Sequence, residues 1–216
     1  CKQDMLEALK RIIKIYSGTI DALFHEDRKA LQELANEAAE FRTMIKDRRK
    51  YELVPTLKAL EEAKMETAHY YVRVLDYLNE VSKSLLDFAR SSQAYIDNTH
   101  SGFNEEQLND LKTINAPMLE VYKGFTKVVK NDDYSHLSDI LITRDHLFSL
   151  FGEAIRRQIK RSRNPEIGSR NSMLYLDLLN EAKNMALQTR SLIKAQRYLM
   201  QPFDVSHHFP KVEDTE

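Results

Sequence analysis

The sequence predicts an all-α protein built from two tandem, sequence-related three-helix bundles. Gly and Pro number only five each among 216 residues and Trp is absent, a composition typical of long helices. Apolar residues recur at three-and-four spacing over most of the chain, the period of one face of an α-helix. The pattern stops near residue 100 and then restarts. We therefore expect units over 1–100 and 101–200, followed by a flexible tail over 201–216.

The first unit contains three predicted helices. Apolar spacing predicts the first over Leu6–Leu23, and the run His25-Glu26-Asp27 interrupts it. A second stripe covers Leu31–Ile45 and ends in the basic run Lys46–Lys50. The third helix is predicted over Pro55–Asn98, because Pro is well suited to the first turn of a helix.

The second unit repeats this order. Turn-forming residues fill the segment 97–102, and Asn104 then offers an N-cap with Gln107 as its capping-box partner. The predicted helices are Leu108–Val129, His136–Arg161 and Ser169–Met200, with breaks at 131–133 and 164–168.

An internal match supports duplication. The hexapeptide Leu75–Glu80 agrees with Leu176–Glu181 at five of six positions. A turn-rich break follows the first helix of each unit, and a basic run ends the second. The shared apolar phase predicts that Leu75 and Leu176 occupy equivalent core positions.

Each matched hexapeptide carries two carboxylates, Asp76 with Glu80 and Asp177 with Glu181. Residues four apart lie on one face of a helix, here away from the apolar stripe. A hard cation could bridge such oxygens. The alternative is a solvated face on which charges alternate in sign, as they do around the first pair. The second pair has no basic neighbour on its own helix, so it is the better metal candidate.

Other histidines suggest less chemistry. Glu66 and His69 have the Glu-x-x-His spacing of di-iron bundles, but no second copy accompanies them, so a surface pair is favoured. His100 is predicted to be a loop or capping residue, and His207 and His208 fall in the tail.

Charge and cysteine content narrow the classes of function. The net charge of −1 gives no overall attraction to nucleic acid, and no nucleic-acid partner is expected. The basic runs 46–50 and 156–163 instead suit an anionic membrane surface. Cys1 is the only cysteine, which favours a reducing compartment. No Gly-rich phosphate loop, Ser-His-Asp set or HExxH motif indicates an enzyme.

The ends of the chain and its apolar runs give a further expectation. No run approaches the roughly 18 apolar residues of a membrane span, which predicts a soluble fragment. The start at Cys1, without an initiator, suggests a piece of a longer protein, and a mature lipoprotein is the alternative.

The tandem units and their paired carboxylates resemble PhoU, the phosphate-uptake regulator. The segments His69–Glu80 and Asp97–His100 are similar to the PhoU-like domain that follows the membrane part of bacterial sodium/phosphate cotransporters. The resemblance implies a non-enzymatic regulatory domain of phosphate transport on the cytoplasmic side of the bacterial inner membrane. Its partners would be the membrane transporter part or other phosphate-transport proteins, and a homodimer is possible.

The resemblance also implies divalent or trivalent metal ions at Asp76, Glu80, Asp177 and Glu181. Additional ligands would come from the second helix of each unit, where the candidates are Glu37, Glu40 and Asp145. The alternative function is a freestanding helical adaptor in phosphate signalling with solvated acidic pairs. The third hypothesis is an enzyme of the carboxylate-bundle type.

Overall fold

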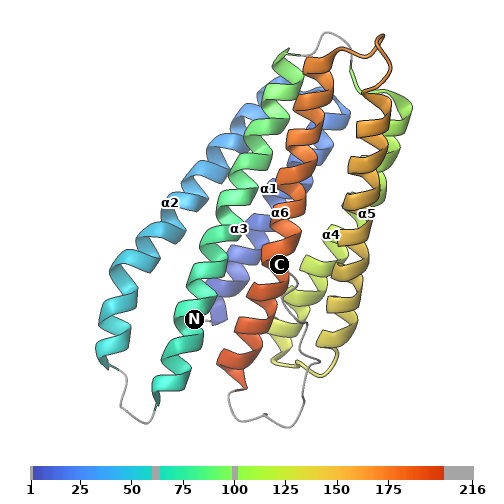
Figure 1. Ribbon diagram of the computed structural model, residues 1–216. Coiled ribbons are helices and arrows are strands. Elements are labelled where there is room, and N and C mark those ends of the chain that lie inside the picture. The colour runs from blue at the N-terminus through green and yellow to red at the C-terminus, as the bar shows by residue number, and fades with distance from the viewer. Residues whose placement is uncertain (1, 60–63, 99–101, 202–216) are drawn as a thin grey trace.

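The computed structural model describes residues 2–59, 64–98 and 102–201, and within them it contains helices and no strands (Figure 1). This confirms the all-α class. The helices are α1 (Lys2–Phe24), α2 (Arg28–Ala59), α3 (Met65–Asn98), α4 (Glu105–Asn131), α5 (Leu137–Arg161) and α6 (Ser169–Met200). None of these helices is long and apolar enough, over the described residues, to cross a membrane.

Consecutive helices run in alternating directions (Figure 1). The most extensive helix–helix contact joins α3 and α6, which lie antiparallel along each other at the centre. Next, α2 covers α3, and α5 packs against both α4 and α6. Helix α1 contacts α2, α3 and α4, so it links the N-terminal helices to the C-terminal ones.

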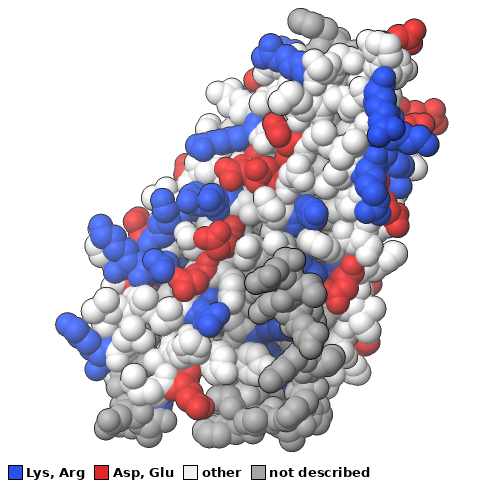
Figure 2. All heavy atoms as spheres, in the orientation of Figure 1, with Lys and Arg blue, Asp and Glu red and all other residues white. Residues whose placement is uncertain are grey.

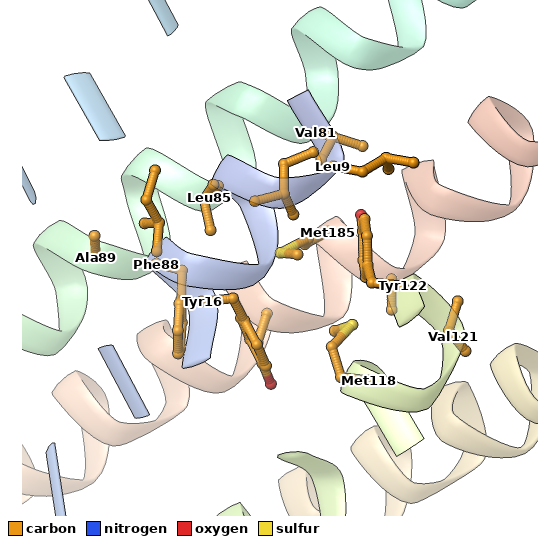
Figure 3. Packing of buried hydrophobic residues seen from close by; sticks show 14 of the residues in the cluster. Leu9, Tyr16, Val81, Leu85, Phe88, Ala89, Met118, Val121, Tyr122 and Met185 are labelled. Atoms are coloured by element: carbon orange, nitrogen blue, oxygen red, sulfur yellow. The ribbon is translucent and has the colours of Figure 1, made fainter. Parts of the chain in front are cut away.

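The buried side chains form one connected hydrophobic cluster that draws on all six helices. Figure 3 shows Tyr16 of α1 and Phe88 of α3 on one side, and Met118 and Tyr122 of α4 with Met185 of α6 on the other. Each of these five side chains is at most 1 % exposed. The division into separate units at residue 100 therefore stays a prediction, because the described core is continuous across both halves.

The buried positions of the N-terminal hairpin recur 106 residues later. All five buried residues of α2 have a buried counterpart in α5. These pairs are Leu31 and Leu137, Ala35 and Leu141, Ala38 and Arg144, Phe41 and Leu147, and Ile45 and Phe151. Helices α1 and α4 share the same interval, because Tyr16 and Tyr122 are both fully buried.

Two local features recur at that same interval. Glu26 and Asp132 follow the first helix of their halves, and both have a φ of 50°, a left-handed conformation that commonly closes a helix. A Cβ on Gly18 would lie 3.0 Å from the side chain of Leu34, and one on Gly124 would lie 3.2 Å from Ile140. Glycine thus allows the first two helices of each half to approach closely.

The third helices correspond at an interval of 101 residues, as the hexapeptides predict. Leu78 and Leu179 are both buried, 2 % and 0 % exposed. Leu75 is buried too, whereas its counterpart Leu176 is only half-buried. The prediction of equivalent core positions is therefore wrong for Leu176. The neighbouring Leu178 is fully buried where its counterpart in α3 is half-buried, so α6 presents a slightly different face to the core.

The predicted boundary between the second and third helices is wrong. Helix α2 continues past the basic run Lys46–Lys50 to Ala59 and contains Pro55 in its interior. Proline removes one backbone donor there, but α2 packs against α3, and the Thr56 side chain lies close enough to Tyr71 to act on the pKa of its hydroxyl. Tertiary packing thus outweighs the local preference for a break at Pro55.

Other boundaries agree closely with the sequence. Asn104 caps α4, accepting a bond from the Gln107 amide at 2.8 Å while the Gln107 side chain accepts from the Asn104 amide at 3.1 Å. The capping box is therefore confirmed. Predictions for Cys1, His100, His207 and His208, and for all of the tail after Gln201, concern residues outside those described.

Candidate functional site

The first acidic pair lies on the outer face of α3 and takes part in a cross-helix ion pair. Asp76 accepts from Nε of Arg49 in α2 at 2.6 Å, and its side chain is 40 % exposed. Glu80, one turn later, is exposed. Arg73 does not complete the charge ladder suggested by the sequence at this point, because it donates to the hydroxyl of Tyr77 at 3.1 Å. A cation on the neighbouring helix already compensates Asp76.

The second pair lies in a more acidic environment. Asp177 is exposed and Glu181 is half-buried. Burial raises the pKa of Glu181, and repulsion from Asp87 of α3 and from Asp177 raises it further. A hydrogen bond from Asn184 and the ammonium of Lys83 act in the opposite direction.

The repeat explains why the two pairs differ. The residue 106 positions after Arg49 is Ile155, which carries no charge to pair with Asp177. The sequence ranked the second pair above the first because of basic neighbours on the same helix. The structure adds a different reason for that order. Arg49 of α2 pairs with Asp76, whereas α5 has the uncharged Ile155 at the matching position.

The described residues contain no group of three or more His, Cys, Asp or Glu side chains that could hold a metal ion. Two of the three proposed additional ligands have other contacts. Glu37 accepts from Lys14 at 2.7 Å, and Asp145 accepts from Arg144 at 2.9 Å. Glu40 is exposed on α2. Metal binding at the four motif carboxylates is untested by this geometry and stays a prediction.

Glu66 and His69 both lie exposed near the start of α3. The imidazole of His69 packs edge-on against Tyr70, with ring centroids 5.5 Å apart and planes at 67°. This aromatic contact gives His69 a packing role in the N-terminal turns of α3.

The basic run at the end of α5 is partly neutralised. Asp110 of α4, only 5 % exposed, accepts from Arg157 at 2.7 and 3.0 Å and from Arg161 at 3.3 Å. Arg161 also donates to the exposed Glu106 at 3.0 Å. These bonds hold α4 to α5 at this end of the bundle.

Three other cations of this run, Arg156, Lys160 and Arg163, are exposed. Figure 2 shows Lys and Arg gathered over the part of α5 near its C-terminal end. The run Lys46–Lys50 differs, because it lies inside α2 with nine residues of helix beyond it. The expectation that both runs end their helices is therefore confirmed only for α5.

Sequence reasoning missed the buried cation Arg144. Its guanidinium donates to the backbone carbonyl of Ala186 in α6 at 2.9 Å and lies over the ring of Phe148, 4.8 Å from the centroid. Burial lowers the pKa of Arg144, whereas Asp145 raises it. Its burial could have been predicted from its position on the apolar stripe of α5, between Leu141 and Leu147.

Over its described residues, the chain thus forms an all-α bundle of six helices whose packing positions recur between its halves. No protein-family model matches the chain, and a search of curated proteins found no significant match. The resemblance to PhoU-like domains accordingly rests on the segments quoted from the sequence.

Proposed function

We propose that this chain is a non-enzymatic, PhoU-like regulatory domain of phosphate transport, formed by two sequence-related three-helix bundles in tandem. The observation that supports this most is the recurrence of packing positions at constant intervals, 106 residues for the first two helices and 101 for the third. A duplicated unit explains the shared turns, glycine contacts and hexapeptides together. The same tandem organisation is what the sequence resemblance implies for the PhoU-like family.

The domain would lie on the cytoplasmic side of a bacterial inner membrane, joined to a sodium/phosphate cotransporter-like membrane part. Arg156, Lys160 and Arg163 support this placement, because exposed basic residues near an anionic surface contribute about 1 kcal/mol each. Regulation would then act through contacts of the bundle with the transporter, rather than through chemistry on a substrate.

A direct experiment uses the full-length protein that contains this chain. It would be reconstituted into liposomes, and sodium-driven uptake of radioactive phosphate would be compared with that of a version lacking residues 2–201. Regulation predicts a changed rate or a changed response to phosphate concentration. Identical uptake curves would contradict the proposal, and a full-length protein without apolar spans would leave the adaptor function in its place.

The second candidate, a helical adaptor without bound metal, is favoured by one observation. Asp76 already pairs with Arg49 at 2.6 Å, and two carboxylates on one helix supply too few ligands for an ion that takes six or more oxygens. At the second pair, Asp177 and Glu181, the geometry still allows a metal ion to bind.

Calorimetric titration of metal-stripped protein with manganese, iron, zinc and magnesium separates these forms. Binding that is lost in Asp177→Asn with Glu181→Gln, but retained in Asp76→Asn with Glu80→Gln, would place the ion at the second pair. Equal binding by both double variants would reject both pairs as ligands. No binding by the intact protein would support the metal-free adaptor or regulator.

A further inference from the structure

A pocket of about 320 Å³ opens between the N-terminal half of α3 and the C-terminal half of α6. Its described lining is His69, Tyr70, Arg73, Tyr77, Ser191, Lys194, Ala195 and Tyr198, and none of these residues is acidic. The volume is at the lower end of the range for small-molecule sites. Two cations and four hydroxyl-bearing side chains thus share one small cavity.

Aromatic rings from both helices close one side of this pocket. Tyr70 of α3 stacks on Tyr198 of α6, with ring centroids 5.0 Å apart and planes at 20°. His69 meets Tyr70 edge-on at 5.5 Å. The rings provide an apolar surface for the organic part of a ligand.

The cationic groups are held by their surroundings. Arg73 donates to the Tyr77 hydroxyl at 3.1 Å, which fixes its guanidinium at the pocket. Lys194 is half-buried on the opposite helix. The pKa of Lys194 is lowered, first by burial of the ammonium and next by repulsion from Arg190, while Asp145 raises it and Arg144 lowers it.

The repeat provides an internal comparison, because the lining positions have counterparts at the other ends of α3 and α6. The counterparts of Arg73 and Lys194, 101 residues away, are Leu174 and Gln93. The counterpart of Tyr198 is Asp97. Cations stand instead at the counterparts of His69 and Ser191, which are Arg170 and Arg90. The fold therefore does not require a cation or an aromatic ring at the positions of Arg73, Lys194 and Tyr198.

We propose that this pocket binds the phosphoryl group of a small ligand. Arg73 and Lys194 supply the positive charge, and the hydroxyls of Tyr77 and Ser191 supply donors. Guanidinium and ammonium groups form strong charge-assisted bonds with phosphate oxygens. Inorganic phosphate and an organic phosphate such as a nucleotide share this chemistry, and the aromatic wall would contact the organic part of the latter. Binding here does not require attachment to a transporter.

The test is calorimetry of the chain with inorganic phosphate, adenosine monophosphate and adenosine at constant ionic strength. Arg73→Gln with Lys194→Gln should weaken phosphate or nucleotide binding about tenfold or more. The control, Arg90→Gln with Arg170→Gln, removes two exposed cations at the other ends of α3 and α6 and should leave the affinity unchanged. Helical content and melting temperature are compared for all variants, and Arg73→Gln alone is the milder substitution.

Binding of phosphate and nucleotide together, lost only in the pocket variant, would support the proposal with free phosphate as a sufficient ligand. Binding of the nucleotide alone, lost in the same way, would support it with an organic phosphate as the ligand. Three results would overturn it: no binding by the intact chain, adenosine binding as tightly as its monophosphate, or equal weakening by both double variants.

Discussion

The two repeat-related tyrosines Tyr16 and Tyr122 should respond oppositely to replacement by phenylalanine. Both are fully buried in the central core, and their hydroxyl groups point in opposite directions (Figure 3). The Tyr122 hydroxyl lies 2.5 Å from that of Thr189. The residue equivalent to Thr189 in α3 is Phe88, which stacks on Tyr16 at 5.2 Å and offers no hydrogen-bonding group. Among the described residues, the Tyr16 hydroxyl has no partner.

The expected magnitudes follow from this difference. A buried polar group without a partner costs about 1 to 3 kcal/mol, so Tyr16→Phe should stabilise the fold by about 1 kcal/mol. A satisfied hydrogen bond contributes about 0.5 to 1.5 kcal/mol, so Tyr122→Phe should destabilise it by a similar amount. For a chain of this size, about 1 kcal/mol shifts the melting temperature by 2 to 4 °C. The two variants should therefore melt about 4 to 8 °C apart.

Thermal and urea unfolding followed by circular dichroism measures both effects on one baseline. The double variant Tyr16→Phe with Tyr122→Phe should fall near the parent, because the two changes offset each other. Destabilisation by both single substitutions would refute the reasoning, since it would mean that the Tyr16 hydroxyl is satisfied in solution. Equal effects of either sign would refute the comparison between the halves.

Three further substitutions test other parts of the structure. Asp110→Ala should lower the free energy of unfolding by about 2 to 4 kcal/mol in urea titrations, because it leaves two arginines without their buried carboxylate. The control Glu106→Ala, on the exposed side, should cost less than about 1 kcal/mol in the same measurement. Glu181→Gln should raise the melting temperature at pH 7, because the raised pKa of Glu181 means that the fold disfavours its charge. The gain should fade below pH 4.5, the ordinary pKa of Glu, where both the folded and the unfolded chain carry the protonated acid. Phe88→Ala should cost about 3 to 5 kcal/mol through the cavity it leaves, and a loss below 1 kcal/mol would show that the core collapses to fill it.

Most of the fold could be predicted from apolar periodicity and capping residues, because both act over a few residues. The interruption at His25-Glu26-Asp27 and the capping box at Asn104 appear as the sequence predicts. Pro55 was assigned to the start of a helix by the same local rules, and there they fail. Long-range packing of α2 along α3 decides that boundary, and no spacing within the segment reports it.

The candidate sites were less predictable, because their character depends on which helix lies opposite. Asp76 was visible as one member of an acidic pair, but its partner Arg49 is 27 residues away in sequence. The pocket between α3 and α6 joins Arg73 to Lys194, which no local spacing connects. Helical periodicity shows which face of a helix is exposed, and only the assembled bundle shows which charges meet across it.

Comparison of matched positions in the two halves helps to separate residues that the fold requires from residues available for function. Positions that the fold requires keep their burial in both copies, as Leu31 and Leu137 do, or Leu78 and Leu179. Positions that change from apolar to charged, as Leu174 and Arg73 do, are not constrained by packing in the same way. Arg49 and Ile155 show the same divergence beside the acidic pairs. Differences between matched positions therefore direct the search for ligand contacts to the pocket between α3 and α6 and to the acidic face around Asp177.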